Sequence, residues 1–126
     1  MSNQVSIDEE LVKYLQATGY RSDPVINKLV DETLALGNVS AMQIAPEQGQ
    51  FLEIIVKILN ANSCLEIGRF TGLSSLCIAR GLPESGKLIT IDNSDEFLTM
   101  AEKYWRMANQ ENKIESIIGD LSLIHI

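Results

Sequence analysis

The sequence is poor in the residues on which several common kinds of catalytic site depend. It has one histidine, His125, and two cysteines, Cys64 and Cys77, which do not form a Cys-x-x-Cys pair. A histidine-based triad and a zinc site both need more of these residues. Both cysteines stand in apolar segments, so we expect buried, reduced thiols rather than a disulfide.

Positive charge and long apolar runs are also scarce. Ten basic residues stand against seventeen acidic ones, the net charge is −7, and the basic residues form no cluster. This balance argues against a nucleic-acid partner. No apolar run approaches the roughly 20 residues that a membrane helix needs, and the N-terminal MSNQVSIDEE lacks the layout of a signal peptide. We therefore expect a cytoplasmic protein with no membrane partner.

What the sequence does contain is an ordered series of helix and strand patterns in one domain. Residues 1–61 are predicted to be helical. A capping box at Ser6–Glu9 begins a first helix, which runs to about residue 17. A second helix begins at Asp23-Pro24 and ends at Gly37, and a third begins at Pro46 after a loop at 38–45. Residues 62–126 read as strand, helix, strand, helix, strand, with the last helix starting at Ser94-Asp95-Glu96. This alternation predicts an α/β fold with about three parallel strands.

A candidate ligand site lies where the first predicted strand turns into a helix, in LEIGRFTGLSS (65–75). Ligands of open α/β sheets bind at the carboxyl ends of the strands, where glycines such as Gly68 and Gly72 allow close approach. Asp92 ends the next strand at the same edge, and an acid there can accept both ribose hydroxyls of a nucleoside. Two acids, with Glu66 as the other, favour a cationic adenosine-type ligand over a phosphate-bearing one.

Blander interpretations of the same residues remain open. The glycines can serve only a tight turn, Glu66 can be solvated, and Asp92 can be an acid at a helix N-terminus. The Gly-x-x-x-Gly spacing also differs from the Gly-x-Gly-x-x-Gly of dinucleotide-binding proteins.

Three segments carry a family resemblance: MQIAPEQGQFLEIIVKIL, LEIGRFTGLSSLCIARGLPESGKLITID and KIESIIGD. Together they resemble the cation-dependent O-methyltransferases, the caffeoyl-CoA and catechol O-methyltransferase group, from about Tyr14 to Asp120. That family binds S-adenosylmethionine on a Rossmann-like sheet and moves its methyl group to a phenolic or catechol oxygen of a small molecule. A divalent metal, usually magnesium, holds the acceptor, and the family is often dimeric.

The resemblance implies a role for each matched position. Glu66 and Gly68 would face the methionine and ribose part of the cofactor, Ser74 its methionine carboxylate, and Asp92 its ribose hydroxyls. Ile44, in the loop before Pro46, would cover the cofactor.

Two positions depart from the family pattern. Leu121, which would lie by the adenine, stands where alanine often follows Gly-Asp, and its larger side chain could crowd the adenine pocket. Arg69, which we also count among the cofactor-binding residues, stands where a small or apolar residue is commoner. A cation beside a sulfonium would repel it, so we expect Arg69 to turn to solvent or to pair with an acid.

The resemblance also implies that parts of the enzyme lie beyond this chain. The family's metal-binding acids and its Asp-Asn pair come after the position that matches residue 126, and its sheet has seven strands with the first at the centre. We assign no catalytic residue and no metal ligand, and we expect the first strand to have an open edge. The interpretation is the N-terminal portion of an S-adenosylmethionine-dependent O-methyltransferase, with weak or no methyl transfer by the chain alone. A nicotinamide dinucleotide oxidoreductase and a non-catalytic module that binds cofactor or a partner chain are the alternatives.

Overall fold

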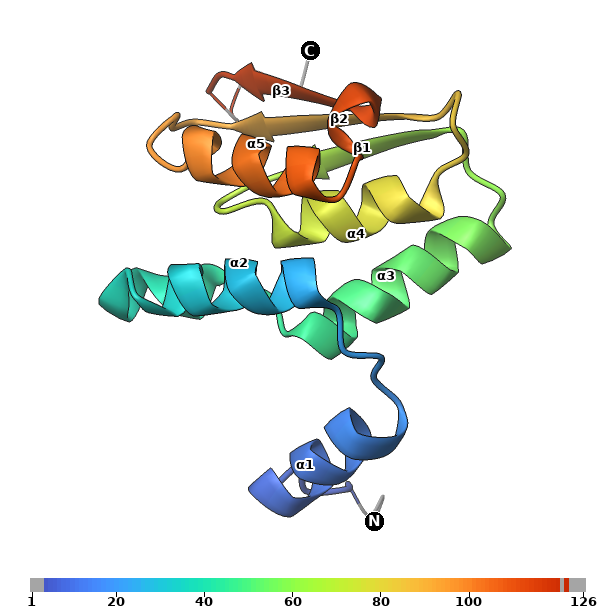
Figure 1. The fold of residues 1–126 in the computed structure, drawn as a ribbon, viewed down its shortest axis with the longest axis vertical. Coiled ribbons are helices and arrows are strands. Elements are labelled where there is room, and N and C mark those ends of the chain that lie inside the picture. The colour runs from blue at the N-terminus through green and yellow to red at the C-terminus, as the bar shows by residue number, and fades with distance from the viewer. Residues whose placement is uncertain (1–3, 121, 123–126) are drawn as a thin grey trace.

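Three parallel strands form a sheet at one side of the molecule in the computed structural model, which describes residues 4–120 and 122 (Figure 1). They are β1 (Ser63–Ile67), β2 (Lys87–Asp92) and β3 (Ile114–Ile118), paired in the order β1-β2-β3. The register sets Leu65 opposite Ile89, and Ile89 opposite Glu115. The prediction of an α/β fold with three parallel strands is confirmed, and β1 is an edge strand of this sheet as expected.

The described helices lie on one side of the sheet (Figure 1). The two crossover helices α4 (Leu73–Gly81) and α5 (Leu98–Met107) are nearest to it, as the right-handed rule for parallel strands requires when both connections run in the same direction. Beyond them, α3 (Pro46–Ile58) packs against α4, and α2 (Pro24–Leu34) packs against both α4 and α5. The first helix, α1 (Glu9–Thr18), has no buried residue and projects away from the rest.

Several predicted helix boundaries were wrong. Asp8, not Ser6, caps α1, since its side chain accepts the amide of Leu11. The second helix ends at Leu34, and the loop predicted at 38–45 contains most of the 3₁₀ helix η1 (Gly37–Met42). The last helix begins at Leu98 rather than at 94–96, because Asp92 and Ser94 hold the intervening amides in turns.

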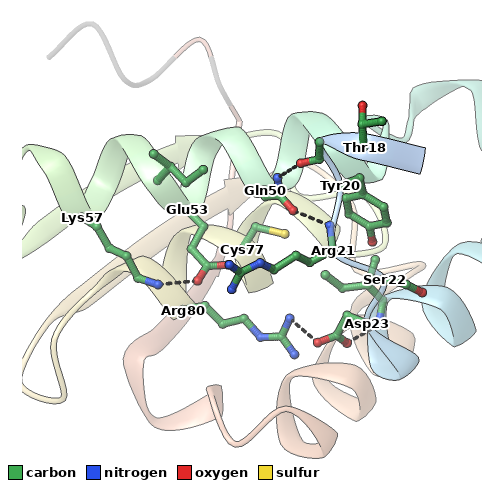
Figure 2. A pocket seen from close by; sticks show the side chains of 13 residues that line it. Thr18, Tyr20, Arg21, Ser22, Asp23, Gln50, Glu53, Lys57, Cys77 and Arg80 are labelled. Atoms are coloured by element: carbon green, nitrogen blue, oxygen red, sulfur yellow. Dashed lines mark hydrogen bonds and ion pairs between the residues drawn. The ribbon is translucent and has the colours of Figure 1, made fainter. Parts of the chain in front are cut away.

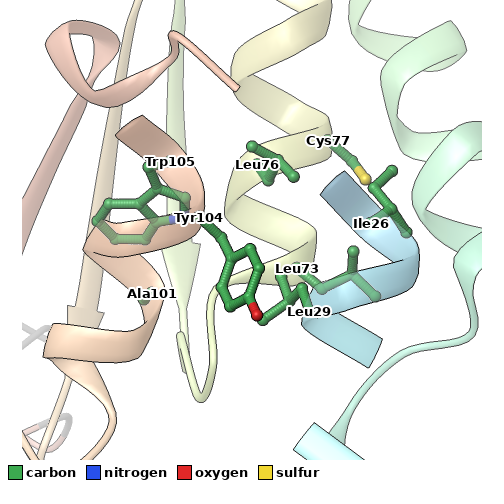
Figure 3. Close-up of a cluster of buried hydrophobic side chains, with 8 residues drawn as sticks. All are labelled: Ile26, Leu29, Leu73, Leu76, Cys77, Ala101, Tyr104 and Trp105. Atoms are coloured by element: carbon green, nitrogen blue, oxygen red, sulfur yellow. The ribbon is translucent and has the colours of Figure 1, made fainter. Parts of the chain in front are cut away.

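The main hydrophobic core lies between α2, α4 and α5 rather than directly under the strands (Figure 3). Its buried members are Ile26, Leu29, Leu73, Leu76, Cys77, Ala101, Tyr104 and Trp105. Burial raises the pKa of the Cys77 thiol to about 12, so this cysteine is an inert packing residue. Both cysteines are free, as expected, although Cys64 is only partly buried.

Polar contacts join the layers at two points. Buried Lys113, in the 3₁₀ helix η2 (Glu111–Lys113), donates from Nζ to the carbonyls of Ala79 (3.2 Å) and Leu82 (3.0 Å) at the end of α4. A cation is favourable there because the carbonyl end of a helix carries partial negative charge. On the other side, the Tyr104 hydroxyl of α5 donates to the carboxylate of Glu32 in α2.

Candidate functional site

The turn from β1 into α4 has three residues in the left-handed region of backbone conformation, and their structural roles differ. Gly68 has φ +88°, and a Cβ built on it would meet nothing within 4 Å. Gly72 has φ +89°, but a Cβ there would lie 2.7 Å from Nε1 of Trp105 and 2.8 Å from Cβ of Ala101. Gly68 therefore borders open space, whereas Gly72 is needed so that α5 can approach α4. Phe70, between them, holds φ +50°, a costly conformation for a non-glycine residue.

Asp92, at the end of β2, holds this turn in place. Its Oδ2 accepts the amides of Arg69 (2.8 Å) and Phe70 (3.1 Å), and its Oδ1 accepts the amide of Ser94 (3.1 Å). Partial burial alone would raise the pKa of Asp92, but these three amides and the Arg69 guanidinium outweigh burial, and the pKa lies below its ordinary value. A carboxylate has roughly four lone-pair positions, so one on Oδ1 stays free. The predicted acceptance of both ribose hydroxyls would need one amide to be released.

Glu66 sits on the helix-facing side of β1 and is surrounded by hydroxyl groups. Its carboxylate accepts hydrogen bonds from Ser74 and Ser75 at the start of α4, and from Thr90 of β2 at 2.7 Å. Glu66 and Ser74, predicted to share one site, do lie in contact. The hydrogen bonds orient the carboxylate firmly, so the blander interpretation of a solvated Glu66 does not hold.

Arg69 does neither of the two things expected of it. It is 2% exposed, so it does not turn to solvent, and among the described residues it forms no ion pair. Its guanidinium instead donates to Oγ of Ser116 in β3 (2.8 Å) and to the carbonyl of Ser94 (2.7 Å), while its Nε has no partner. The side chain contacts the helix-facing side of β3, where neutral oxygens compensate for its burial in place of an acid.

A small cavity of about 70 Å³ joins this turn to the segment before α3. Ile44 lines it together with Gly68, Arg69 and Ser74. The structure thus brings together four of the seven predicted cofactor residues around one hollow, with Glu66 in contact through Ser74 and Asp92 through the backbone of Arg69. The seventh, Leu121, lies outside the described residues.

Comparison with known proteins decides the family. The O-methyltransferase family model matches residues 16–124. The chain belongs to the O-methyltransferase family. It is 31% identical to a catechol O-methyltransferase of Niastella koreensis, over 94% of this chain and 52% of that protein. It is also 33% identical to caffeoyl-CoA O-methyltransferase 2 of Populus trichocarpa, over 85% of this chain and 44% of that protein.

A solved O-methyltransferase, that of Bacillus cereus in complex with S-adenosylhomocysteine, has the same fold. Its TM-score is 0.79 at 29% identity, over 90% of this chain and 50% of that one. The Rossmann-like methyltransferase fold, present in part, is thereby confirmed. This O-methyltransferase chain spans about half the length of the curated relatives it matches.

A larger cavity of this O-methyltransferase chain lies elsewhere, between the α1–α2 linker, α3 and α4, with a volume of about 890 Å³ (Figure 2). Its polar groups mostly satisfy one another: Arg80 pairs with Asp23 at 3.0 Å and Lys57 with Glu53 at 2.6 Å. Gln50 accepts the amide of Arg21 and donates to the carbonyl of Gly19. Because it contains none of the predicted cofactor residues, we interpret it as the anchorage of the linker on α3.

Sequence reasoning missed the residues that support the site. Ser75 and Thr90 hold Glu66, and Ser94 and Ser116 hold Arg69. The strand residues could have been found from period-two alternation, because Thr90 and Ser116 face the same side of the sheet as Glu66 and lie opposite each other in the register. Nothing in the sequence indicates the contact with the Ser94 carbonyl.

Two features are absent from residues 4–120 and 122. No group of three or more histidine, cysteine or acidic side chains is placed to hold a metal ion. No helix in that part of the chain is long and apolar enough to cross a membrane.

Proposed function

We propose that this chain forms the cofactor-binding part of an S-adenosylmethionine-dependent O-methyltransferase whose acceptor is a small molecule with a phenolic or catechol-type hydroxyl. The observation that carries the proposal is the convergence of Glu66, Ser74, Asp92 and the open Gly68 at one end of the sheet in a chain of this family.

The residues present fit the adenosine and methionine parts of the cofactor. Gly68 leaves room beside its Cα, and Asp92 keeps one free acceptor position for a ribose hydroxyl. The amides at the start of α4 can donate to a carboxylate, and the Ser74 hydroxyl can do so if it releases Glu66. When bound, the cofactor supplies an electrophilic methyl group on a sulfonium, and the anionic Glu66 and Asp92 favour a ligand of that charge.

The part of the site that would bind the methyl acceptor is also a proposal. A divalent metal such as magnesium would orient the acceptor hydroxyl and lower its pKa. We propose that its ligands, and the acceptor pocket, come from polypeptide other than residues 4–120, because those residues bring no suitable cluster together.

The net charge, the exposed apolar residues and the free thiols support proposals about the partners and the location of the protein. We propose a homodimer, since Leu11, Tyr14 and Leu15 of α1 are exposed apolar residues on a helix that buries none of its own. The net charge of −7 supports the absence of a nucleic-acid partner, and two free cysteines are consistent with a cytoplasmic location.

Calorimetric titration tests the proposal, with S-adenosylhomocysteine and NAD as ligands of the wild-type chain. We expect binding of the first only, weakened about tenfold or more by Asp92→Ala, since a charged hydrogen bond contributes about 1.5–3 kcal/mol. Glu115→Ala is the matched control, because Glu115 lies on the opposite face of the sheet from the site. Binding of NAD without S-adenosylhomocysteine would refute the proposal. Tight S-adenosylhomocysteine binding without methyl transfer, even when the rest of the domain is supplied, would favour the non-catalytic module.

A further inference from the structure

A cluster of three polar side chains lies beside the small cavity between the β1–α4 turn and the segment before α3. Thr33 of α2 and Thr71 of the turn are both fully buried, and Gln43, directly after η1, is partly buried. The Thr33 hydroxyl donates to Oγ1 of Thr71 at 3.0 Å. Nε2 of Gln43 donates to Oγ1 of Thr33 at 3.0 Å and to Oγ1 of Thr71 at 3.2 Å. The cluster therefore joins three segments that are distant in the sequence.

These contacts orient the carboxamide of Gln43 and leave its oxygen available. A carboxamide nitrogen has two N–H donors, and both are used here, one on each threonine. Among the described residues none donates to Oε1 of Gln43, and this oxygen is not one of the buried side-chain oxygens that lack a partner. A buried network on one side thus holds an accessible acceptor in place.

The cavity suits the amino-acid end of the cofactor. Gln43 lines it together with Gly68 and with residues 72–74 at the start of α4. Its volume of about 70 Å³ is far below the roughly 300–1,000 Å³ of pockets that enclose a whole small molecule, so it fits one end of a ligand. The carboxylate of that end is proposed above to take the amides at the start of α4. The ammonium group is bonded to the same carbon as the carboxylate, so it reaches the same cavity.

An ammonium group needs acceptors, and these are scarce among the side chains of the cavity. In the described part of the chain no acidic side chain lines it, and Arg69 has only donors. Oγ1 of Thr71 already accepts two hydrogen bonds, and the Ser74 hydroxyl is directed to Glu66. Gln43 supplies the carboxamide oxygen of the lining.

We propose that Gln43 is a cofactor-binding residue whose Oε1 accepts a hydrogen bond from the ammonium group of S-adenosylmethionine. The buried pair of threonines is the support that keeps the carboxamide in position. The inference rests on the proposed function, since it assumes that the cofactor lies at this end of the sheet. It adds a residue to which neither the sequence pattern nor the family resemblance assigned a role.

Calorimetric titration of the chain with two ligands tests the proposal. One is S-adenosylhomocysteine, and the other is its deamino analogue, in which a hydrogen replaces the ammonium group. Gln43→Met removes the acceptor and keeps a side chain of similar length. It should weaken the binding of S-adenosylhomocysteine about tenfold or more, because a hydrogen bond to a charged group is lost. The same variant should bind the deamino analogue as wild type does.

Gln43→Glu separates the acceptor from the two N–H donors. It keeps an oxygen for the ammonium group, and the threonine hydroxyls can rotate and donate to its other oxygen. We expect it to bind S-adenosylhomocysteine at least as tightly as wild type does. Gln48→Met is the matched control, because Gln48 is an exposed glutamine of α3 that does not line the cavity, and it should leave both affinities unchanged.

The outcomes that overturn the proposal differ from those that overturn the proposed function. Equal weakening of both ligands by Gln43→Met would show that Gln43 only supports the turn, and unchanged binding of S-adenosylhomocysteine would show that it does not touch the ammonium group. Either result leaves the proposed function intact. A wild-type chain that binds neither ligand would overturn the proposed function and this inference together. If circular dichroism shows Gln43→Met to be unfolded, Gln43→Glu decides: a weaker preference for S-adenosylhomocysteine over the deamino analogue than in wild type would overturn the proposal.

Discussion

At the scale of single residues, Arg69 shows how a buried cation can be held without an acid. Its guanidinium donates to the hydroxyl of Ser116 in the middle of β3 and to the carbonyl of Ser94 just after β2, while its own amide donates to Asp92. One residue thus links the β1–α4 turn, the β2–α5 turn and β3. An apolar residue at this position could also be buried, but it could not link the three segments by hydrogen bonds from its side chain.

The charge of Arg69 should be measurable through Asp92. Arg69→Met removes the charge and keeps a side chain of similar length, whereas Arg69→Lys keeps the charge. Because the guanidinium helps to lower the pKa of Asp92, the Met variant should show a pKa closer to the ordinary 3.8 and the Lys variant should retain most of the lowering. NMR titration of the Asp92 carboxyl carbon measures this. An unchanged Asp92 pKa in the Met variant would show that the three amides alone set it.

At the scale of elements, the sequence predicted every strand and the start of α2 and α3 because each carries a local signal. Asp23-Pro24 and Pro46 fix helix starts, and alternation marks the strands. The start of α5 was missed because Asp92, outside the helix, takes the amide of Ser94 and so moves the start to Leu98. The 3₁₀ helix η1 has no comparable capping signal: no side chain caps it.

The contact between α2 and α5 predicts a loss of stability in alkali. Burial, the hydrogen bond to Glu32 and the charges of Glu32 and Asp31 raise the pKa of Tyr104 from 10.0 to about 12. The folded state therefore holds the phenol proton more tightly than the unfolded state does. The stabilisation is complete below pH 10 and is lost as pH rises from about 10 to 12, up to about 2–3 kcal/mol in the free energy of unfolding.

Urea unfolding at pH 9 to 11.5 measures how the free energy of unfolding changes with pH in wild type and in two variants. Tyr104→Phe should have a shallower pH dependence than wild type, since the titrating group is gone. Tyr14→Phe, on exposed α1, should keep the wild-type slope. Equal slopes in wild type and Tyr104→Phe would contradict the assignment.

At the scale of the whole molecule, the sequence and its family resemblance led to the fold and to one end of the site, and the reason is physical. The strands, their order along the chain and the acids at their ends are local features, so Glu66, Gly68, Ser74 and Asp92 could be placed before any coordinates. Alternation along the strands could place Thr90 and Ser116 on the same face of the sheet as Glu66, but it could not show that Glu66 binds Thr90 or that Arg69 reaches Ser116. Those contacts join segments more than twenty residues apart, and no spacing rule links them.

The projecting helix α1 gives the last prediction. A chain that lacks residues 1–17 loses no buried side chain of α1 and keeps Gly19 and Arg21, which anchor the linker to Gln50. If α1 joins two copies through Leu11, Tyr14 and Leu15, the truncated chain should sediment at half the mass of the full chain. Its unfolding should no longer depend on protein concentration, since only dimers are stabilised by mass action. Tyr14→Ser should weaken the dimer in the same direction, while Glu10→Ser, a change of an exposed polar residue of α1, should not. A truncated chain that still sediments as a dimer would place the contact between copies on a surface other than α1.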